Sequence, residues 1–147
     1  MPKGLLLDCD AQVAAWAFQA YNRRPMHVDR ALGIIDKGEL VGAVFFSSYN
    51  GVNAEISYYG KGTMSLGIIR TLAKIALYEL HLARLTAIVP KRPSFLLKKL
   101  GKIGWRYEGV QKRHYGHVDA PRNTGCRFVL FKEDLERLAK TPVKEVA

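Results

Sequence analysis

Three strand-like runs that follow one another between residues 31 and 60 constrain the fold most. Residues 31–36 and 39–49 are rich in Ile, Val and Phe and are separated only by Lys37 and Gly38, a pattern typical of a β-hairpin. Residues 52–60 follow directly after Asn50 and Gly51, which form a second turn signal. The sequence therefore predicts three consecutive antiparallel strands.

The hydrophobic period becomes helical after this meander. Ile68, Leu72 and Ile75 recur at three- and four-residue spacing within residues 64–80, which predicts a long helix. We also expect a helix at 10–23 capped by Asp8 or Asp10, a strand at 83–90, a helix at 94–104 capped by Ser94, strands at 105–116 and 126–132, and a helix at 133–140. This order predicts a single α/β domain over residues 1–147, with a mixed, mostly antiparallel central sheet flanked by helices.

Composition excludes several classes of protein. The chain has 147 residues, of which 48% are hydrophobic and 24% charged, as in ordinary globular domains and unlike disordered chains. Two cysteines are too few for a disulfide scaffold and fit a reducing compartment. Because the N-terminal residues carry early acidic groups and no apolar run is long enough to span a bilayer, we expect a cytoplasmic protein with no membrane partner.

The net charge of +10 is concentrated in the middle of the chain. Residues 1–60 contain five basic and six acidic side chains. Residues 61–118 contain twelve basic and two acidic side chains, and residues 119–147 contain six basic and five acidic ones. A local excess of this kind indicates an anion-binding face. We assign that face to Lys91, Arg92, Lys99, Lys102, Arg106, Lys112 and Arg113.

Residues 65–90 and 94–110 resemble the long helix, fifth strand and following helix of the GNAT superfamily of N-acetyltransferases. The second stretch contains the Lys-x-Gly-aromatic element of that family, here at residues 102–105. The resemblance extends more loosely from Ala31 to Phe131 and implies a GNAT-like domain that transfers acetyl from acetyl-CoA directly to an amine acceptor. In its brevity and degenerate motifs, the chain resembles the small GNAT-like proteins of tailed phages, which act in the host cytoplasm.

The sequence departs from the family pattern at three places. Both glycines of the family's pyrophosphate loop are replaced, at Thr63 and Ser65, and the usual Asn and Tyr of the following helix fall on Pro93 and Leu100. A helix N-terminus with free backbone N–H groups can still hold a phosphate. The cofactor-binding residues that the resemblance implies are Ser57, Tyr59, Gly62, Thr63, Met64, Ser65, Leu66, Gly67, Ser94 and Lys98.

The resemblance places two catalytic groups on the third strand of the meander. Glu55 lies where the family often has a carboxylate that removes the proton of the amine. Tyr58 and Tyr59 lie where two family strands splay apart, and Tyr58 is favoured as the acid for the leaving thiolate. Strand alternation sends Tyr58 to the face opposite Glu55, so the choice between the two tyrosines depends on register. Alternatively these residues have no catalytic role: Glu55 is then a solvated side chain, and Tyr58 and Tyr59 are aromatic side chains of the core or its rim.

Other functions remain open at this level. His114 and His117 have His-x-x-His spacing, but without a third ligand we expect no metal site. The surplus of basic groups, interleaved with Trp105, Tyr107 and Tyr115, fits a nucleic-acid-directed protein on the same fold, as in the base-modifying Mom family, which also resembles GNATs. A third hypothesis is a GNAT-like protein that has lost its catalytic activity and binds a host protein. The acceptor, and whether the chain is a monomer or a homodimer, are left open.

Overall fold

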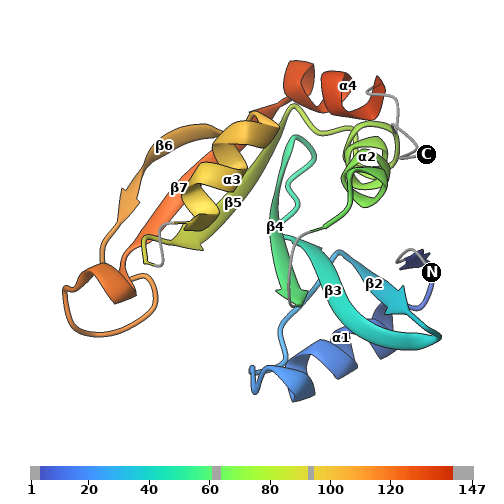
Figure 1. Ribbon diagram of the computed structural model, residues 1–147, viewed down its shortest axis with the longest axis horizontal. Helices are drawn as coiled ribbons and strands as arrows, with labels where there is room; N and C mark the ends of the chain where they lie inside the picture. The colour runs from blue at the N-terminus through green and yellow to red at the C-terminus, as the bar shows by residue number, and fades with distance from the viewer. Residues whose placement is uncertain (1–3, 61–63, 93–94, 141–147) are drawn as a thin grey trace.

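The computed structural model describes residues 4–60, 64–92 and 95–140, with the side chains of residues 95 and 96 excepted. A seven-stranded sheet carries helices on its two faces (Figure 1). The strands are β1 (Gly4–Leu6), β2 (Arg30–Asp36), β3 (Glu39–Ser47), β4 (Asn53–Gly60), β5 (Arg84–Pro90), β6 (Arg106–Gln111) and β7 (Gly125–Phe131). The helices are α1 (Asp10–Ala20), α2 (Leu66–Lys74), the π-helix η1 (Ile75–Glu79), α3 (Phe95–Ile103), the short 3-10 helix η2 (Pro121–Asn123) and α4 (Lys132–Lys140).

The sheet has the order β1-β2-β3-β4-β5-β7-β6. Only β4 and β5 pair in parallel, so the predicted mixed, mostly antiparallel sheet flanked by helices is confirmed. The predicted hairpin is also confirmed, because Lys37 and Gly38 both have positive φ, as a tight two-residue hairpin turn requires. Strand β1, which pairs with the end of β2, was not predicted because its three residues are too few to show a period.

Three predicted boundaries are wrong. The first helix is not capped by an aspartate: its N-cap is Cys9, and the Asp10 carboxylate instead accepts hydrogen bonds from Arg30 and from the N–H of Ala31. This helix ends at Ala20, and Asn22 has a positive φ that no helix continues through. The strand predicted over residues 105–116 stops at Gln111, where a loop begins.

The predicted long helix consists of two parts. Helix α2 begins at Leu66, because the Ser65 side chain accepts a hydrogen bond from the N–H of Ile68 and so caps the first turn. Five residues of π-helix, η1, follow α2 without a break. The cap expected at Ser94 lies outside the described residues.

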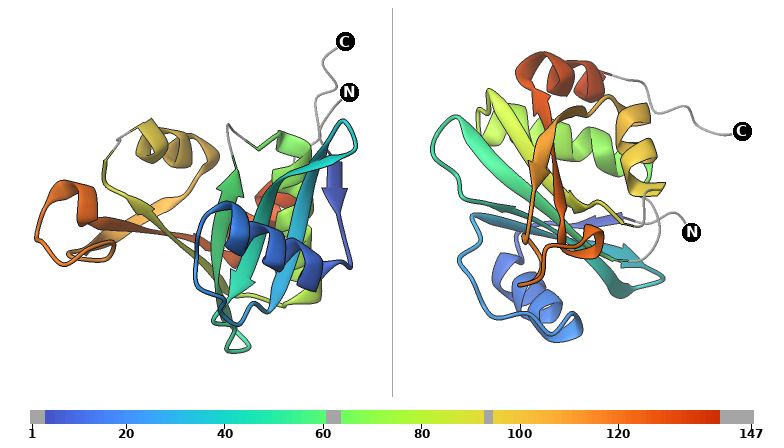
Figure 2. Two further views of the ribbon diagram at one scale, coloured as in Figure 1. Left: turned by 90° about the horizontal axis from the view of Figure 1, so that it is seen from below. Right: turned by 90° about the vertical axis from the view of Figure 1, so that its left-hand side faces the viewer.

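The core is divided by the sheet into two layers. Helices α2 and α4 cover one face, where Leu32, Phe46 and Leu82 are almost completely buried. Helix α1 covers β2 and β3 on the opposite face, around Val13 and Phe45 (Figure 2). Because the first layer includes residues of β2 to β5 and β7, it joins the two halves of the sheet into one packed unit.

Candidate functional site

The two central strands separate after a short parallel pairing. β4 and β5 pair only from Asn53–Arg84 to Glu55–Thr86. Beyond this point β4 remains paired with β3 as far as Gly60, and β5 remains paired with β7 as far as Pro90. The sheet is therefore split between β4 and β5, with each strand held by its other neighbour.

The backbone of both strands presents polar groups to this gap. The N–H of Lys91 donates to the carbonyl of Thr124, and the N–H of Lys132 donates to the carbonyl of Ala83. The backbone N–H and C=O groups of odd-numbered β5 residues therefore point toward β7, and those of the even-numbered Ile88 point into the gap. The carbonyl of Val52 accepts hydrogen bonds from the N–H groups of Ala83 and Arg84, so the backbone N–H and C=O groups of even-numbered β4 residues point toward β5. The gap is thus bordered by main-chain donors and acceptors, as a site for an extended ligand with amide groups would be.

Tyr115 borders the β5 side of the gap. This residue lies in the loop between β6 and β7, and its hydroxyl donates to the carbonyl of Ile88 at 3.1 Å. Its pKa is raised to about 12, mainly by burial of the hydroxyl, with Arg23 lowering the pKa and Tyr59 raising it. The phenol is therefore protonated at neutral pH and lies close to side chains of the opposite wall.

Glu55 lies at the end of the parallel pairing. It is half-buried and is paired with Ser47 on β3 and with Thr86 on β5, both of which are buried. The Thr86 hydroxyl donates to the Asn53 side chain at 2.9 Å and accepts from Arg84 at 3.1 Å. The structure thus places the backbone of Glu55 where the gap opens, two residues along the strand, or roughly 7 Å, from the level of Ile88.

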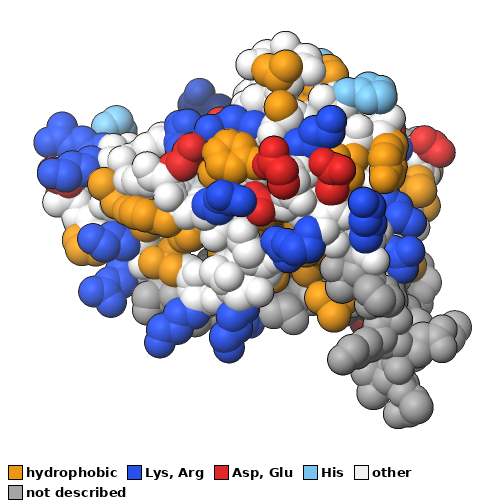
Figure 3. Space-filling view, turned by 90° about the horizontal axis from the view of Figure 1, so that it is seen from above, with side chains coloured by type: hydrophobic (Ala, Val, Ile, Leu, Met, Phe, Trp, Pro, Cys, Tyr) orange, Lys and Arg blue, Asp and Glu red, His pale blue; other side chains and the backbone are white. Residues whose placement is uncertain are grey.

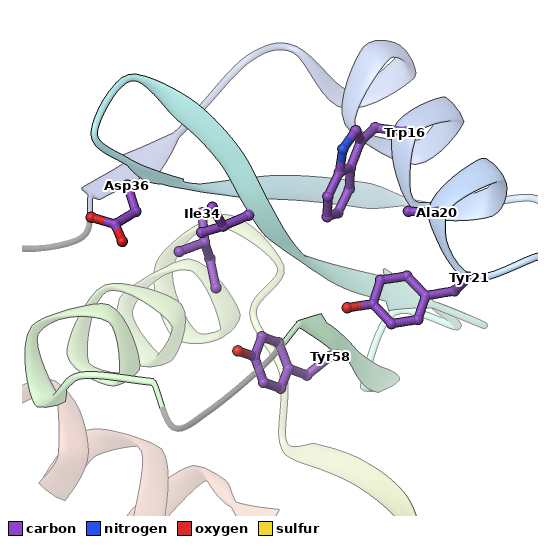
Figure 4. Close-up of a pocket in the computed structure, with 7 residues that line it drawn as sticks. Trp16, Ala20, Tyr21, Ile34, Asp36 and Tyr58 are labelled. Atoms are coloured by element: carbon purple, nitrogen blue, oxygen red, sulfur yellow. The ribbon is translucent and has the colours of Figure 1, made fainter.

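Tyr58 lies on the opposite face, as strand alternation predicted, and packs against the layer under α2. A Cβ atom at Gly60 would lie only 2.6 Å from its hydroxyl, so the ring extends along β4 toward Gly60. Burial raises its pKa, and Tyr21 adds to that rise. The Tyr21 side chain extends from the end of α1 toward Tyr58 across a cavity of about 510 Å3 (Figure 4). That cavity is lined by Trp16, Ala20, Tyr21, Ile34, Asp36, Val41 and Tyr58.

Tyr59 belongs to an aromatic cluster on the α1 side of the sheet. Its ring lies 5.0 Å from that of Phe45 and 5.5 Å from that of Tyr21, and the Arg23 guanidinium lies 5.6 Å from its centroid. Ser57 is half-buried and pairs with Phe45, so it faces the same side. The sequence-based cofactor residues on β4 therefore lie on the α1 face, and Tyr58 lies on the other.

The N-terminus of α2 follows the end of β4. Met64 packs against the core, whereas Leu66 is exposed. Among the described residues, a Cβ atom at Gly67 would meet only the Ser65 hydroxyl, at 3.9 Å, so these residues leave space beside the first turn. N–H groups in a first helical turn lack intrahelical partners and attract anions. Gly62, Thr63 and Ser94 lie outside the described residues.

The predicted basic face is exposed, but some of its members are paired. Arg106 forms two hydrogen bonds with Asp134, at 3.0 and 3.1 Å, and these interactions raise its pKa. Lys112 lies 4.0 Å from Asp119. Five further members of this face, together with Lys98, are exposed and lie on or around α3 and in the β6–β7 loop: Lys91, Arg92, Lys99, Lys102 and Arg113.

Two site residues were missed from the sequence. The sequence predicts Tyr115 only as a stacking surface for nucleic acid, and it predicts no role for Arg23. Both lie in loops, and their approach to Tyr59 depends on how α1 and the β6–β7 loop pack against the sheet. No periodic signal in the sequence reports that packing.

Similar folds occur among solved acetyltransferases. A ribosomal-protein-S5-alanine acetyltransferase from Vibrio fischeri aligns over 90% of this chain and 93% of its own, with a TM-score of 0.63 at 16% identity. A mutant form of the spermidine/spermine N-acetyltransferase SpeG from Vibrio cholerae aligns over 84% of this chain and 77% of its own, with a TM-score of 0.65 at 13% identity. The chain therefore has the fold of the GNAT acetyltransferases, as expected.

The similarity has limits in length and in sequence. The chain spans only 60% and 62% of the length of two further acetyltransferase structures, with TM-scores of 0.64 and 0.58 at 15% and 23% identity. No protein-family model matches the sequence. No curated protein matches it either.

The described part of the chain contains neither a membrane-spanning helix nor a cluster of metal-ligating side chains. None of its helices is both long and apolar enough to cross a membrane. In the same residues, no three His, Cys, Asp or Glu side chains are grouped so that they could hold a metal ion.

Proposed function

We propose that the protein transfers acetyl from acetyl-CoA directly to an amine. The observation that carries this proposal is the end of the β4–β5 pairing at Glu55 and Thr86, which leaves a gap lined by backbone polar groups and followed by the N-terminus of α2. The similarity of the fold to acetyltransferases supports the same reaction.

The residues around the gap fit the proposed cofactor. Its pantetheine arm carries amide groups that match the backbone of Ile56 and Ile88, and its phosphates match the first turn of α2 at Ser65, Leu66 and Gly67. The space beside Gly67 leaves room for a phosphate. When bound, acetyl-CoA supplies the thioester carbonyl that the amine attacks.

Glu55 is the proposed general base. Its carboxylate stands at the mouth of the gap and can accept the proton of the attacking amine, directly or through a water molecule. Buried neighbours on both sides, Ser47 and Thr86, fix its backbone position.

A phenol is proposed to act at the leaving sulfur. Tyr58 remains the proposed proton donor, although its hydroxyl extends toward Gly60 and so requires the thiolate to lie at that end of β4. Tyr115 borders the other wall, and its pKa of about 12 makes it a hydrogen-bond donor rather than an efficient proton donor to a thiolate. Tyr58→Phe and Tyr115→Phe separate the two roles in one assay.

Release of coenzyme A from acetyl-CoA, measured with a panel of amines, tests the proposal. Two of the structures with similar folds are named for spermidine and for a protein alanine, so the panel begins with spermidine and an alanine-initiated peptide. Glu55→Gln is expected to lower kcat about 100-fold or more, since a positioned base contributes that much, with little change in KM for acetyl-CoA.

Glu39→Gln, at the exposed start of β3, is the matched control and should leave kcat unchanged. Equal rates for the two variants would remove Glu55 from the mechanism. No coenzyme A release with any amine would contradict the proposed activity.

A further inference from the structure

The two halves of the sheet carry opposite charge. Residues 4–60 contain four basic and six acidic side chains, whereas residues 84–131 contain eleven basic and two acidic ones. Both acidic groups of the second half are ion-paired, Glu108 with Arg84 and Asp119 with Lys112. This half of the sheet therefore has a strongly positive surface, which we call the basic end and define by seven exposed side chains: Lys91, Arg92, Lys98, Lys99, Lys102, Arg113 and Arg122.

The basic end is wider than the cofactor site proposed above. Viewed from above, Lys and Arg side chains lie across this face and continue to its left-hand end, whereas most of the acidic side chains gather in the middle (Figure 3). In the strand order β4-β5-β7-β6, the outer strand β6 is roughly 14 Å from β4. Phosphates held at the N-terminus of α2 are therefore too distant, by more than one Debye length of about 8 Å, to neutralise the charge around β6.

An exposed aromatic ring lies on the same face of the sheet as α3. Tyr107, on the edge strand β6, is 58% exposed and pairs with the buried Phe128. Phe128 holds the Tyr107 ring edge-on, with the centroids 5.5 Å apart. Val110, 49% exposed, lies on this face of β6 as well. Ile103, at the end of α3, packs against the layer that contains Leu130, which places α3 over this face.

We propose that the basic end binds single-stranded nucleic acid, with phosphates on the α3 lysines and a base stacked on Tyr107. Lys98 and Lys102 are one helical turn apart, so their repulsion is relieved by an anion. Stacking on an aromatic ring beside a track of cations is the general mode of single-strand binding, because every base has a π-face. The acidic first half of the sheet repels the strand and so confines it to this end.

Fluorescence anisotropy tests the surface with oligothymidylate and oligouridylate of about 12 nucleotides, a length within the usual range of single-strand sites. Lys98→Gln/Lys99→Gln/Lys102→Gln is expected to reduce the slope of log affinity against log salt by about 2, since each single-strand phosphate contact contributes about 0.7. The control Lys37→Gln/Lys74→Gln/Lys140→Gln removes the same charge from exposed sites elsewhere and should leave the slope nearly unchanged. Equal slopes in the two triple variants would overturn the proposal.

Tyr107→Ala tests the stacking contact. It is expected to weaken single-strand binding about 5- to 150-fold, whereas Tyr78→Ala, which removes a 65% exposed ring from η1, should have no effect. Equal affinities for single strand and duplex, with Tyr107→Ala neutral, would contradict single-strand recognition.

Saturating acetyl-CoA separates this proposal from the one above. Persistence of oligonucleotide binding is expected, because the basic end extends beyond the gap. Complete competition would show that the only anion site is that of the cofactor and would overturn the proposal. The measurement requires no catalytic activity, so an inactive protein that binds the strand leaves this inference intact.

Discussion

The two halves of the sheet differ in what their exposed surfaces carry. The first half, β1 to β4 with α1, is slightly acidic and presents aromatic rings around Tyr59 and the cavity beside Tyr58. The second half, β5 to β7 with α3, is strongly basic. They are held together by three residue pairs between β4 and β5 and by the shared layer under α2. Chemistry is proposed at the border because backbone groups, the Glu55 carboxylate and phenols from both halves lie near one another there.

The shared layer should make the two halves unfold together. Phe46, fully buried on β3, is expected to lose about 3–5 kcal/mol of unfolding free energy as Phe46→Ala. Urea unfolding can be followed separately through Trp16 in the first half and Trp105 in the second, using variants that keep one tryptophan. Coincident shifts of both midpoints are predicted. A shift confined to Trp16 would show that the halves are independent.

The ion pair between Arg106 and Asp134 joins the start of β6, in the second half, to the first turn of α4. Burial opposes ionisation of Asp134, but hydrogen bonds from Arg106 and from the N–H of Phe131 outweigh it and lower the pKa of this carboxyl. Asp134→Ala is expected to cost about 1–2 kcal/mol, as for the loss of a helix cap. Because the folded-state pKa is depressed, this stability is present above the unfolded pKa of about 3.9 and is lost as pH falls below it.

Denaturation at neutral pH and near pH 3 tests this prediction. The difference between Asp134→Ala and the unmodified protein should shrink at the lower pH. A difference that does not depend on pH would assign the effect to packing instead.

The smallest predicted effect concerns the phenol that borders the gap. Tyr115→Phe removes the hydrogen bond to Ile88 and is expected to cost about 0.5–1.5 kcal/mol. Because the folded pKa is raised to about 12, the contribution of the phenol to stability is complete below the unfolded value of about 10 and is lost as pH rises through 12.

Ultraviolet titration of tyrosinate provides the measurement. One tyrosine that ionises near pH 12 should be absent from Tyr115→Phe. An unchanged titration would mean that the loop does not hold Tyr115 against β5.

The sequence predicts the order of elements well, because hydrophobic periods and turns such as Lys37-Gly38 are local signals. It cannot reveal that Asp10 pairs with Arg30 instead of capping its helix, since that contact joins residues 20 positions apart. Glu55 could be placed on a strand because strand patterns are local. Tyr115 could not be placed beside Ile88, because that contact also joins residues far apart in the sequence. The charge count located the basic end, but not the pairing of Arg106 with Asp134.

The gap between the two halves, together with the N-terminus of α2, is the proposed site of acetyl-CoA. Titration calorimetry of acetyl-CoA into Gly67→Glu and Gly67→Gln tests it most directly, because both side chains enter open space at the first turn of α2 and suit a helix better than glycine. We predict that acetyl-CoA binds the unmodified protein and binds Gly67→Gln with nearly the same affinity. Its affinity for Gly67→Glu should be lower by about tenfold or more, because the added charge repels the phosphates. Equal affinity of both variants, or no binding heat at all, would contradict it.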